Sequence, residues 1–516
     1  MWKKIILTFC AAAMLTGSLA GCGNSADSLT YDDQGRPIIS IMTQSYNAKS
    51  ASDDAAENPI VAEIEKKLNV DLRFKWISSS NYGEKVTATM GAGTYPLIMR
   101  VNDRNAAIIA NCRGGTFWEV GDLMLDEEKF PVLSKANRQV MNNMSVDGKV
   151  YGVYTARDLG RNGASIRKDW LENLGLDYPE TIEEFREVVR AFTEDDPDGN
   201  GKDDTYGLIM TAHTAPIKDV TVWSGAPNGY GMNEETGQLE PEFFFEEYLD
   251  GLKLLKEFYD NQWMNTNWAT MDANKWNEPF LLGQGGIIID VCDRARRLQT
   301  NIVEKNPDAV VGVFGSVAPK AGEKKRAKPT IGYAGFFVFP KASVKTQEEL
   351  EVCLSLLDRL GEPEIADLTA KGIEGRHYNI VDGEYQHIKL PDGTDDKQYD
   401  NEFADLNQIQ TYINPEDTLL NVPYATDTAR WVAEVMEDNA NYTIANPVAP
   451  FVSNTYALKG TMLDSIMTEA DTKFIKGDIT EEDWKAARDE WRVKGGDDVI
   501  KEYNEQYQAA QENKAE

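Results

Sequence analysis

The sequence predicts an α/β protein with two large lobes. Its 516 residues exceed the length at which a single hydrophobic core keeps growing. Apolar segments with strand and helix periodicity alternate between residues 37 and 101. Hydrophobic residues make up 41% of the chain and aromatic residues 10%, which is ample for folded cores. We therefore expect most of the chain to be globular.

The first elements follow the order of a parallel sheet. Residues 37–42 and 69–76 are predicted as strands, residues 58–68 as a helix and residues 97–101 as a further strand. The helix places four apolar residues on one face: Ile60, Val61, Ile64 and Leu68. Ligands of parallel sheets bind beyond the carboxyl ends of the strands. This rule predicts that Gln44 and Tyr46 lie at a ligand site, with the loop 102–104 beside them.

Later segments predict a second lobe. Residues 168–174 and 181–192 are predicted as helices, the second beginning with a capping box at Thr181. Residues 332–340 form a buried strand in this prediction, and the charged region 462–510 is helical. Within that region Trp484 and Trp491 lie seven residues apart, which favours packing in a core.

The first 36 residues predict export and lipidation. Lys3 and Lys4 precede an apolar run, 5–19, that is shorter than the about 20 residues of a membrane span. Leu19-Ala20-Gly21-Cys22 matches a bacterial lipobox, although an ordinary signal followed by a chance cysteine is the alternative. We expect a signal peptide at 1–21, an acylated Cys22 with a flexible tether through residue 36, and a location on the outer side of the cell membrane.

Composition argues against several function classes. Acids outnumber bases by 85 to 53, so the net charge is −32 and nucleic-acid binding is not expected. The five cysteines show no C-x-x-C spacing, and the three histidines, His213, His377 and His387, are far apart. A structural zinc site, a disulfide framework and histidine-based catalysis are therefore not indicated. Apart from the signal, no stretch is apolar enough to span a membrane, so we expect the protein to be attached to the membrane through lipid alone. We also expect it to be a monomer.

The sharpest motif is an acidic loop at residues 196–207. Oxygen-bearing side chains occupy positions one, three, five and nine, and Gly201 occupies position six: Asp196, Asp198, Asn200 and Asp204. Lys202 at position seven would offer its backbone carbonyl. This is the ligand spacing of an EF-hand calcium loop, except that Gly207 replaces the bidentate Glu at position twelve. Thr205 at position ten, or water, could complete the shell; a solvated turn without metal is the alternative reading.

Around this loop the chain resembles a known family. The block from Arg167 to Leu176, Pro179 to Thr181, Phe185, Ala191-Phe192 and the acidic loop resemble the family 1 type extracellular solute-binding proteins of carbohydrate ABC importers. The similarity is greatest to large lipoprotein members that bind alginate-type oligosaccharides. Weaker matches extend it over essentially the whole mature chain: Tyr151-Gly152-Val153, Gly285-Gly286-Ile287, Gly332-Tyr333, Lys473 to Gly477 and Tyr503 to Tyr507.

The resemblance implies a periplasmic-binding-protein-like fold. Two α/β lobes, joined by several crossings, would close on an oligosaccharide in the cleft between them. We expect residues 37–156 and 310–360 in lobe 1, and residues 157–309 and 361–516 in lobe 2. The resemblance also implies a structural calcium ion, with Thr205 departing from the acid usual at position ten. The partners would be two importer permeases and an ATPase.

Sugar recognition needs flat apolar faces together with planar polar groups. Trp223, Asn228 and Tyr230 lie in a segment rich in turn residues, and Trp268 and Trp276 flank a polar stretch. The other candidates are polar residues near expected crossings, strand ends or loops: Arg157, Arg161, Asp290, Asp293 and Arg376. Arginines in the cleft would suit an anionic sugar such as a uronate or a sulfated glycan. Structural ion pairs are the alternative for Arg157 with Asp158 and for Asp293 with Arg294.

Two other functions remain open from sequence. A lipid-anchored glycoside hydrolase needs only a pair of carboxylates, and a chain with 85 acids always offers some pair. A glycan adhesin without transport would need the same binding chemistry. The family resemblance favours a binding protein, not an enzyme.

Overall fold

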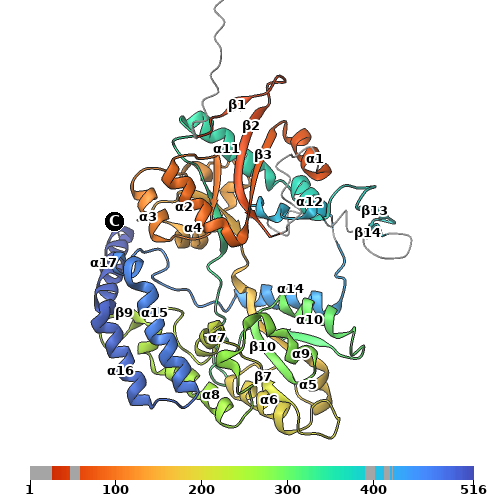
Figure 1. Ribbon diagram of the computed structural model, residues 1–516, viewed down its shortest axis with the longest axis vertical. Helices are drawn as coiled ribbons and strands as arrows, with labels where there is room; N and C mark the ends of the chain where they lie inside the picture. Colours follow the sequence, from red (N-terminus) through yellow and green to blue (C-terminus); the bar gives the residue numbers. More distant parts are fainter. Residues whose placement is uncertain (1–25, 47–57, 390–400, 412–418, 421, 516) are drawn as a thin grey trace, which may run out of the picture.

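The chain folds into two lobes, one above the other in Figure 1. The computed structural model describes residues 26–46, 58–389, 401–411, 419–420 and 422–515. The predicted signal peptide and Cys22 lie outside the described residues. Among the residues that are described, no helix is long and apolar enough to cross a membrane.

Lobe 1 is built on a six-stranded sheet in the order β1-β2-β4-β12-β5, with β3 on the other side of β2. β2 runs parallel to β3 and β4, whereas β12 is antiparallel to β4 and β5. The strands are β1 (Thr30–Tyr31), β2 (Pro37–Ser45), β3 (Asp71–Ser78), β4 (Ile98–Val101), β5 (Gly152–Ala156) and β12 (Tyr333–Val338). The helices are α1 (Pro59–Leu68), α2 (Tyr82–Ala92), α3 (Ala106–Arg113), α4 (Arg138–Met144), α11 (Gln347–Leu360) and α12 (Pro363–Lys371).

The first helix forms where the periodicity predicts it. Asn58 caps α1 by accepting hydrogen bonds from the backbone N–H groups of Ile60 and Val61, and Pro59 occupies the first turn. The four apolar residues predicted for its inner face are all buried. The chain leaves the helix through Asn69 in the left-handed conformation and enters β3.

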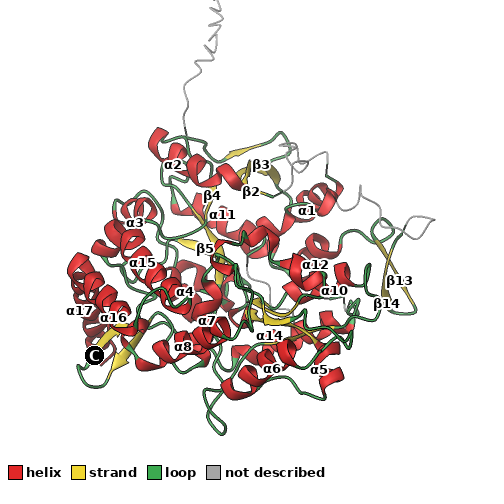
Figure 2. Ribbon diagram, turned by 60° about the horizontal axis from the view of Figure 1, so that its bottom comes forward, coloured by secondary structure: helices red, strands yellow, loops and turns green. Residues whose placement is uncertain are grey.

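Lobe 2 is built on a four-stranded sheet in the order β11-β6-β10-β7. Its strands are β6 (Asn162–Arg167), β7 (Tyr206–Leu208), β10 (Gly285–Val291) and β11 (Val311–Phe314), with a separate hairpin of β8 (Tyr230–Asn233) and β9 (Gln238–Pro241). Its helices are α5 (Lys168–Leu174), α6 (Ile182–Glu194), α7 (Ala215–Trp223), α8 (Glu246–Asp260), α9 (Asn277–Leu281), α10 (Arg294–Ile302), α14 (Asp427–Ala440), α15 (Asn454–Ile475), α16 (Glu481–Trp491) and α17 (Asp497–Ala515). In both lobes helices surround the strands (Figure 2).

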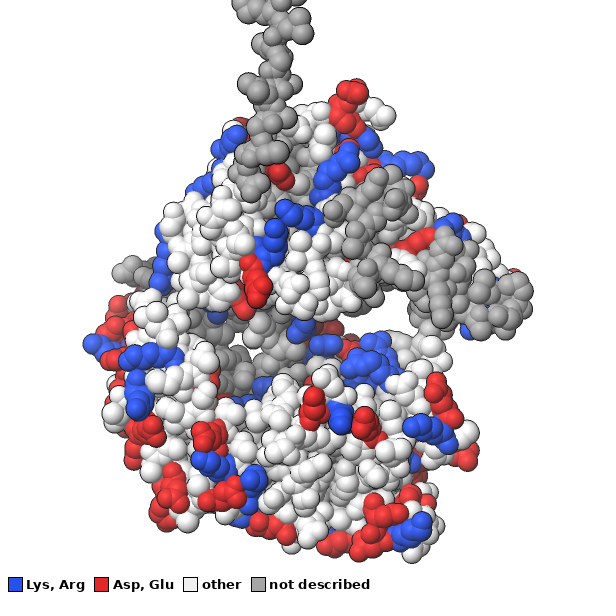
Figure 3. Space-filling view, in the orientation of Figure 1, with Lys and Arg blue, Asp and Glu red and all other residues white. Residues whose placement is uncertain are grey.

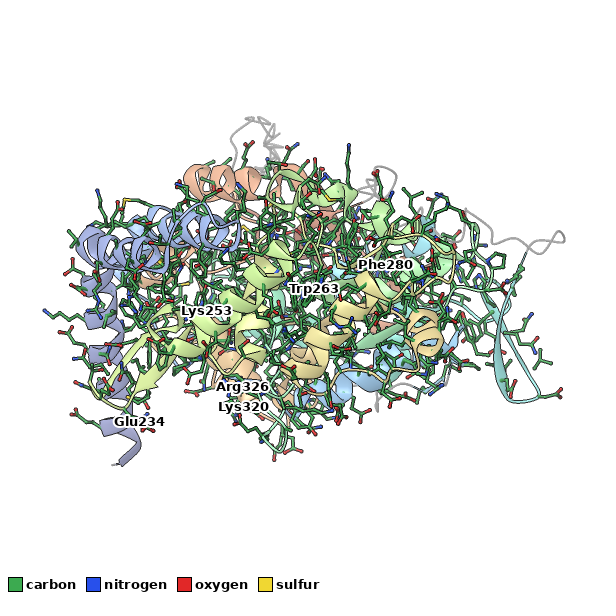
Figure 4. All side chains as sticks on the ribbon, turned by 90° about the horizontal axis from the view of Figure 1, so that it is seen from below. Glu234, Lys253, Trp263, Phe280, Lys320 and Arg326 are labelled. Carbon is green, nitrogen blue, oxygen red and sulfur yellow. The ribbon has the colours of Figure 1, made fainter. Side chains whose placement is uncertain are left out.

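The strand pairing moves the expected boundary at residue 310. β11 pairs with β6 throughout, from Val311 opposite Arg167 to Phe314 opposite Ala164. Arg326 then donates hydrogen bonds to the backbone oxygens of Val222 and Ala226, at the end of α7. Figure 4 labels Arg326 and Lys320 in a view from below. Residues 310–328 therefore belong to lobe 2, and not to lobe 1 as expected.

The expected boundary at residue 361 is also displaced. Ile365 and Leu368 of α12, and Leu406 and Ile409 near the short helix η9 (Leu406–Gln408), are buried in the core of lobe 1. The hairpin of β13 (Tyr378–Val381) and β14 (Glu384–His387) lies between them in sequence. The described residues 363–389 and 401–411 are thus part of lobe 1. Val432 of α14 is buried in the core of lobe 2.

Two crossings between the lobes lie side by side. The first follows β5 and includes the short helix η5 (Leu159–Arg161), and the second precedes β12. The backbone N–H of Thr330 donates to the carbonyl of Leu159, and the Thr330 hydroxyl donates to the carbonyl of Asp158. These hydrogen bonds tie the two crossings together at the base of the interlobe space.

Three thiols lie in the cores. Cys112 and Cys353 are buried in lobe 1, and Cys292 is buried in lobe 2. Burial raises the pKa of each thiol to about 12. These cysteines therefore remain protonated and act as small apolar residues.

Candidate ligand-binding cleft

A cleft of about 960 Å³ opens where β2, β5 and the first crossing meet. Gln44 and Tyr46 reach it from the end of β2, and Arg100 from β4. Arg157 and Arg161 reach it from the first crossing. Figure 3 shows the hollow between the lobes, with basic side chains around it. The rule about carboxyl ends of parallel strands therefore located one wall of this cleft correctly.

The segment containing η9 forms the other part of the lobe 1 wall. Phe403, Ala404, Asp405, Asn407 and Gln408 line the cleft there. The Ser45 hydroxyl and the Tyr46 backbone N–H donate to the Asp405 carboxylate over 2.7 and 2.9 Å. Sequence reasoning missed this wall because its contacts with β2 join residues some 360 positions apart, and no local pattern marks them.

The amides of this wall are hydrogen-bonded to one another. Gln44 Nε2 donates to the side-chain oxygen of Gln408 over 3.1 Å, and the Thr43 hydroxyl donates to the Gln408 backbone oxygen. Asn102 Nδ2 donates to the side-chain oxygen of Gln44 over 3.1 Å. The wall is therefore held in one geometry before any ligand arrives.

Three arginines gather around the cleft, and they differ in their partners. Arg161 forms an ion pair with Asp293 over 2.7 Å. Arg157 is exposed and, within the described part of the chain, has no ion pair. Arg100 is only 1% exposed and donates to oxygens that carry no formal charge. Burial is the main cause that lowers the pKa of Arg100 and of Arg157.

One aromatic side chain is open to solvent at the cleft. Tyr46 is 64% exposed, and Phe403 lines the same space while half-buried. An exposed tyrosine presents a flat face and a hydroxyl to a ligand. Among the aromatic residues predicted at the ligand site, Tyr46 is therefore the best placed to stack on a ligand.

The three predicted tryptophans do not face the cleft. Trp223, Trp268 and Trp276 are between 0 and 2% exposed. Trp223 is the last residue of α7, not a loop residue, and it packs against Phe185 and Phe314 in the core of lobe 2. The prediction that these tryptophans stack on sugar is corrected on that ground, because a buried ring offers no free face.

The remaining candidates lie elsewhere or are paired. Asn228 donates to the Ile444 backbone oxygen, and Tyr230 packs edge-on against Tyr503. Asp290 forms an ion pair with Arg294 over 2.6 Å. Arg376 pairs with Glu402, with Nε 2.8 Å from the carboxylate. Neither these four candidates nor Asp293 is among the residues that line the cleft.

The acidic loop brings together the side chains that the sequence predicts as calcium ligands. The backbone N–H groups of Asn200 and Gly201 donate to the Asp196 carboxylate. Asn200 Nδ2 lies 2.8 Å from a carboxylate oxygen of Asp198 and 3.1 Å from one of Asp204. The Asn200 amide nitrogen thus lies between the carboxylates of Asp198 and Asp204 and is within hydrogen-bond distance of both. Hard oxygen ligands in this arrangement fit calcium chemically.

Position ten of the loop differs from the prediction, and position twelve has no room for a side chain. The Thr205 side chain is buried and its hydroxyl donates to the Phe192 backbone oxygen over 2.9 Å, so it does not face the metal position. A Cβ at Gly207 would lie 2.3 Å from the Val189 backbone oxygen. No side chain fits at position twelve. Among the described residues no group of three His, Cys, Asp or Glu side chains closes on one point.

The family model for the bacterial extracellular solute-binding proteins matches residues 47–348. The chain belongs to this family. Its members bind solutes and are not enzymes, which confirms the expected family, the two-lobed α/β fold and the absence of a catalytic role.

Two relatives match over nearly their full length. The lipoprotein LipO of Bacillus subtilis is 35% identical over 518 residues, covering 99% of both chains. The polygalacturonan/rhamnogalacturonan-binding protein YtcQ of the same organism is 32% identical over 521 residues, again covering 99% of both. A solved structure with the same fold is an EF-hand mutant of the Streptococcus pneumoniae ABC-transporter substrate-binding protein FusA with fructo-nystose. Its TM-score is 0.65, at 17% identity, and the match covers 92% of this chain and 100% of that one.

Proposed function

We propose that this solute-binding protein captures an oligosaccharide in the interlobe cleft and delivers it, as a monomer, to an ABC importer with two permease subunits and an ATPase. The observation that carries the proposal is the cleft itself. It joins planar amides, arginines and the exposed Tyr46 at the crossings between two lobes. Paired hydroxyls of a sugar are recognised by such planar groups, and its C–H faces by an aromatic ring.

The ligand in this proposal is acidic. Arg157 has no carboxylate partner in the described part of the chain, and Arg100 is buried against uncharged oxygens. The exposed guanidinium of Arg157 can therefore form a charge-assisted hydrogen bond with a ligand carboxylate, and the charge of Arg100 behind the wall favours an anion at longer range. The relative YtcQ is named for binding polygalacturonan and rhamnogalacturonan, and both contain uronate residues. Oligogalacturonides are therefore the first ligands to test.

The protein in this proposal is held at the outer side of the cell membrane by an acyl group on Cys22. The lipobox from Leu19 to Cys22 supports this anchoring, and the relative LipO is named as a lipoprotein. Metabolic labelling with a clickable fatty acid should label the wild type, whereas the Cys22→Ala variant should remain unlabelled. Equal labelling of the two proteins would refute the anchor.

A structural calcium ion in the loop 196–207 also belongs to the proposal. Side-chain oxygens of Asp196, Asp198, Asn200 and Asp204 would hold it, together with the Lys202 backbone oxygen. The fold neighbour FusA has been studied as an EF-hand mutant, which supports a metal loop in proteins of this fold. The ion would fix the loop that follows α6 and would take no part in ligand binding.

Calorimetric titration tests the capture of an oligosaccharide. The panel should contain trigalacturonate, rhamnogalacturonan oligosaccharides, maltotriose and kestose, with chromatography of each mixture after incubation. Micromolar or tighter binding of a short oligosaccharide, without cleavage, supports the proposal. Cleavage of any ligand, or binding to polymer alone, contradicts it.

A further inference from the structure

Arg100 occupies an unusual setting at the base of the lobe 1 wall. Its Nη1 donates to the side-chain oxygen of Gln408 over 2.8 Å and to the Gln408 backbone oxygen over 3.2 Å. Its Nη2 donates to the Ala334 backbone oxygen over 2.8 Å. A Cβ at Gly335 would lie 2.9 Å from Nε, so only glycine allows this close approach. The guanidinium is therefore fixed by partners that are all hydrogen-bond acceptors.

This fixation sets the orientation of the Gln408 amide. A guanidinium has five N–H donors and no acceptor, so the Gln408 atom that faces Arg100 must be the oxygen. Gln44 Nε2 donates to the same oxygen over 3.1 Å. The Gln408 nitrogen must then point the other way, and it donates to the side-chain oxygen of Asn407 over 2.9 Å.

The orientation of Asn407 follows from that of Gln408. Because the Asn407 oxygen accepts from Gln408, the Nδ2 group with its two hydrogens is left at the other side of the amide. Asn407 is exposed and lines the cleft. Arg157, which lines the same cleft, also offers donors only. The N–H groups of Asn407 and Arg157 therefore favour a ligand group that accepts several hydrogen bonds.

We propose that Arg100 is a positioning residue that selects acidic ligands without touching them. It polarises the hydrogen-bond chain Gln408–Asn407 so that the cleft presents Asn407 Nδ2, in addition to Arg157, to a ligand carboxylate. The inference rests on the proposed function and deepens it, because it names the residues that discriminate a uronate from its neutral counterpart. A carboxylate accepts from both donors, whereas a methyl ester offers weaker acceptors and no charge.

The decisive variant is Gln408→Glu. One oxygen of a carboxylate at this position still accepts hydrogen bonds from Arg100 and Gln44. The second oxygen replaces the amide nitrogen that donates to Asn407, and it can only accept a hydrogen bond from Asn407. Asn407 would then turn its oxygen toward the ligand. We expect the affinity for trigalacturonate to fall at least about tenfold, while the affinity for its methyl ester changes less than about threefold and the melting temperature is maintained.

Gln410→Glu is the matched control. Gln410 lines the same cleft and donates to the Thr369 hydroxyl, so the variant adds the same charge outside the chain of amides. It should reduce the preference for acid over ester by less than about threefold. An equal loss of preference in both variants would mean that charge alone acts, and would overturn the role of the amide chain.

Arg100→Lys and Arg100→Met separate polarity from packing. Lysine is also a donor without acceptors, so Arg100→Lys should retain most of the preference, whereas Arg100→Met should lose it. A preference retained in Arg100→Met would overturn the proposal; if that variant does not fold, Gln408→Glu decides. Wild-type protein that binds acid and ester equally would overturn this inference alone. Wild-type protein that binds neither would overturn the proposed function, and this inference with it.

Discussion

Nη1 of Arg100 lies 2.8 Å from the side-chain oxygen of Gln408, a residue 308 positions further along the chain. This contact joins β4 to the segment around η9, and so unites two distant parts of the sequence in one wall of the cleft. The same wall receives Gln44 and Tyr46 from β2. This wall of the cleft is therefore assembled by long-range contacts and does not lie within a single loop.

Arg157 is expected to bind the ligand directly. Replacing it by glutamine should weaken trigalacturonate binding about tenfold or more, because a charge-assisted hydrogen bond is lost, with little change in melting temperature. Calorimetry on the purified protein measures this effect. Arg297→Gln is the control, since Arg297 is also exposed but does not line the cleft. Undiminished binding by Arg157→Gln would exclude Arg157 from the site.

Trp223 is expected to support stability and not binding. Trp223→Ala should lower the free energy of unfolding by about 3–5 kcal/mol, since a large ring is removed from a packed core. Urea unfolding measures the loss. Tyr46→Ala is the opposite case, with weakened ligand binding and nearly unchanged unfolding. A stable Trp223→Ala protein with impaired binding would return Trp223 to the site.

Calcium is expected to stabilise lobe 2. Adding a chelator should lower the melting temperature of the wild type, because an ion bound only by the folded protein stabilises it by about 2.7 kcal/mol at a hundred times its dissociation constant. Asp198→Asn should abolish most of this dependence. Asp203→Asn, in the same loop but at a position without a ligand role, should keep it. If the wild type melts at the same temperature with and without chelator, the protein does not bind a stabilising calcium ion.

Position twelve of the loop yields a separate prediction. Gly207→Glu restores the acid that EF-hands carry there, yet it should destabilise the protein by about 1–3 kcal/mol and should not tighten calcium binding. The reason is steric, since the added Cβ would lie 2.3 Å from the Val189 backbone oxygen. Calcium titration of both proteins provides the measurement. Tighter binding by the variant would show that the loop can rearrange around a side chain.

Asp219 makes stability depend on pH. Asp219, on α7, is only 4% exposed, and burial raises its pKa to about 6. The ion pair with Lys328 at 3.4 Å lowers this pKa, and the nearby charge of Asp290 raises it further. A carboxyl group whose pKa is raised by folding stabilises the protein when it is protonated. For Asp219 this stabilisation is fully present below the unfolded pKa of 3.8 and is lost as the pH rises through the folded pKa of about 6.

Comparison with Asp219→Asn isolates this effect from the other acids. Between about pH 3.5 and about pH 7, the unfolding free energy of the wild type should fall by about 3 kcal/mol relative to that of the variant. This value follows from the difference of roughly two pKa units between the folded and unfolded states. Denaturant unfolding at several pH values measures it. A constant difference between the two proteins would mean that Asp219 does not titrate in this window.

The sequence predicted the parts of the fold that local patterns determine. The inner face of α1 and the capping box of α6 at Thr181 are confirmed, as are the buried Trp484 and Trp491. Each depends on residues a few positions apart, where periodicity and capping chemistry decide the outcome.

The site could be predicted only where it follows a strand. Gln44 and Tyr46 line the cleft as the end of β2 requires, and Arg157 and Arg161 follow from the first crossing. The glycine, proline and asparagine that follow Trp223 favour a loop, although Ile217, Val220 and Trp223 mark a buried helix face. Gln408 carries no local signal, because its role depends on pairing with β2 and β4 across the fold.

The three buried thiols have a practical consequence for following lobe closure. Because Cys112, Cys292 and Cys353 are protonated and covered, they will not compete for a thiol-reactive probe in the folded protein. A variant that starts at residue 26 retains only these three of the five cysteines. If one cysteine is introduced on the rim of each lobe of this variant, a thiol-reactive spin label would attach only to these two positions. A change in the distance between the labels on adding ligand would reveal whether the two lobes move toward each other.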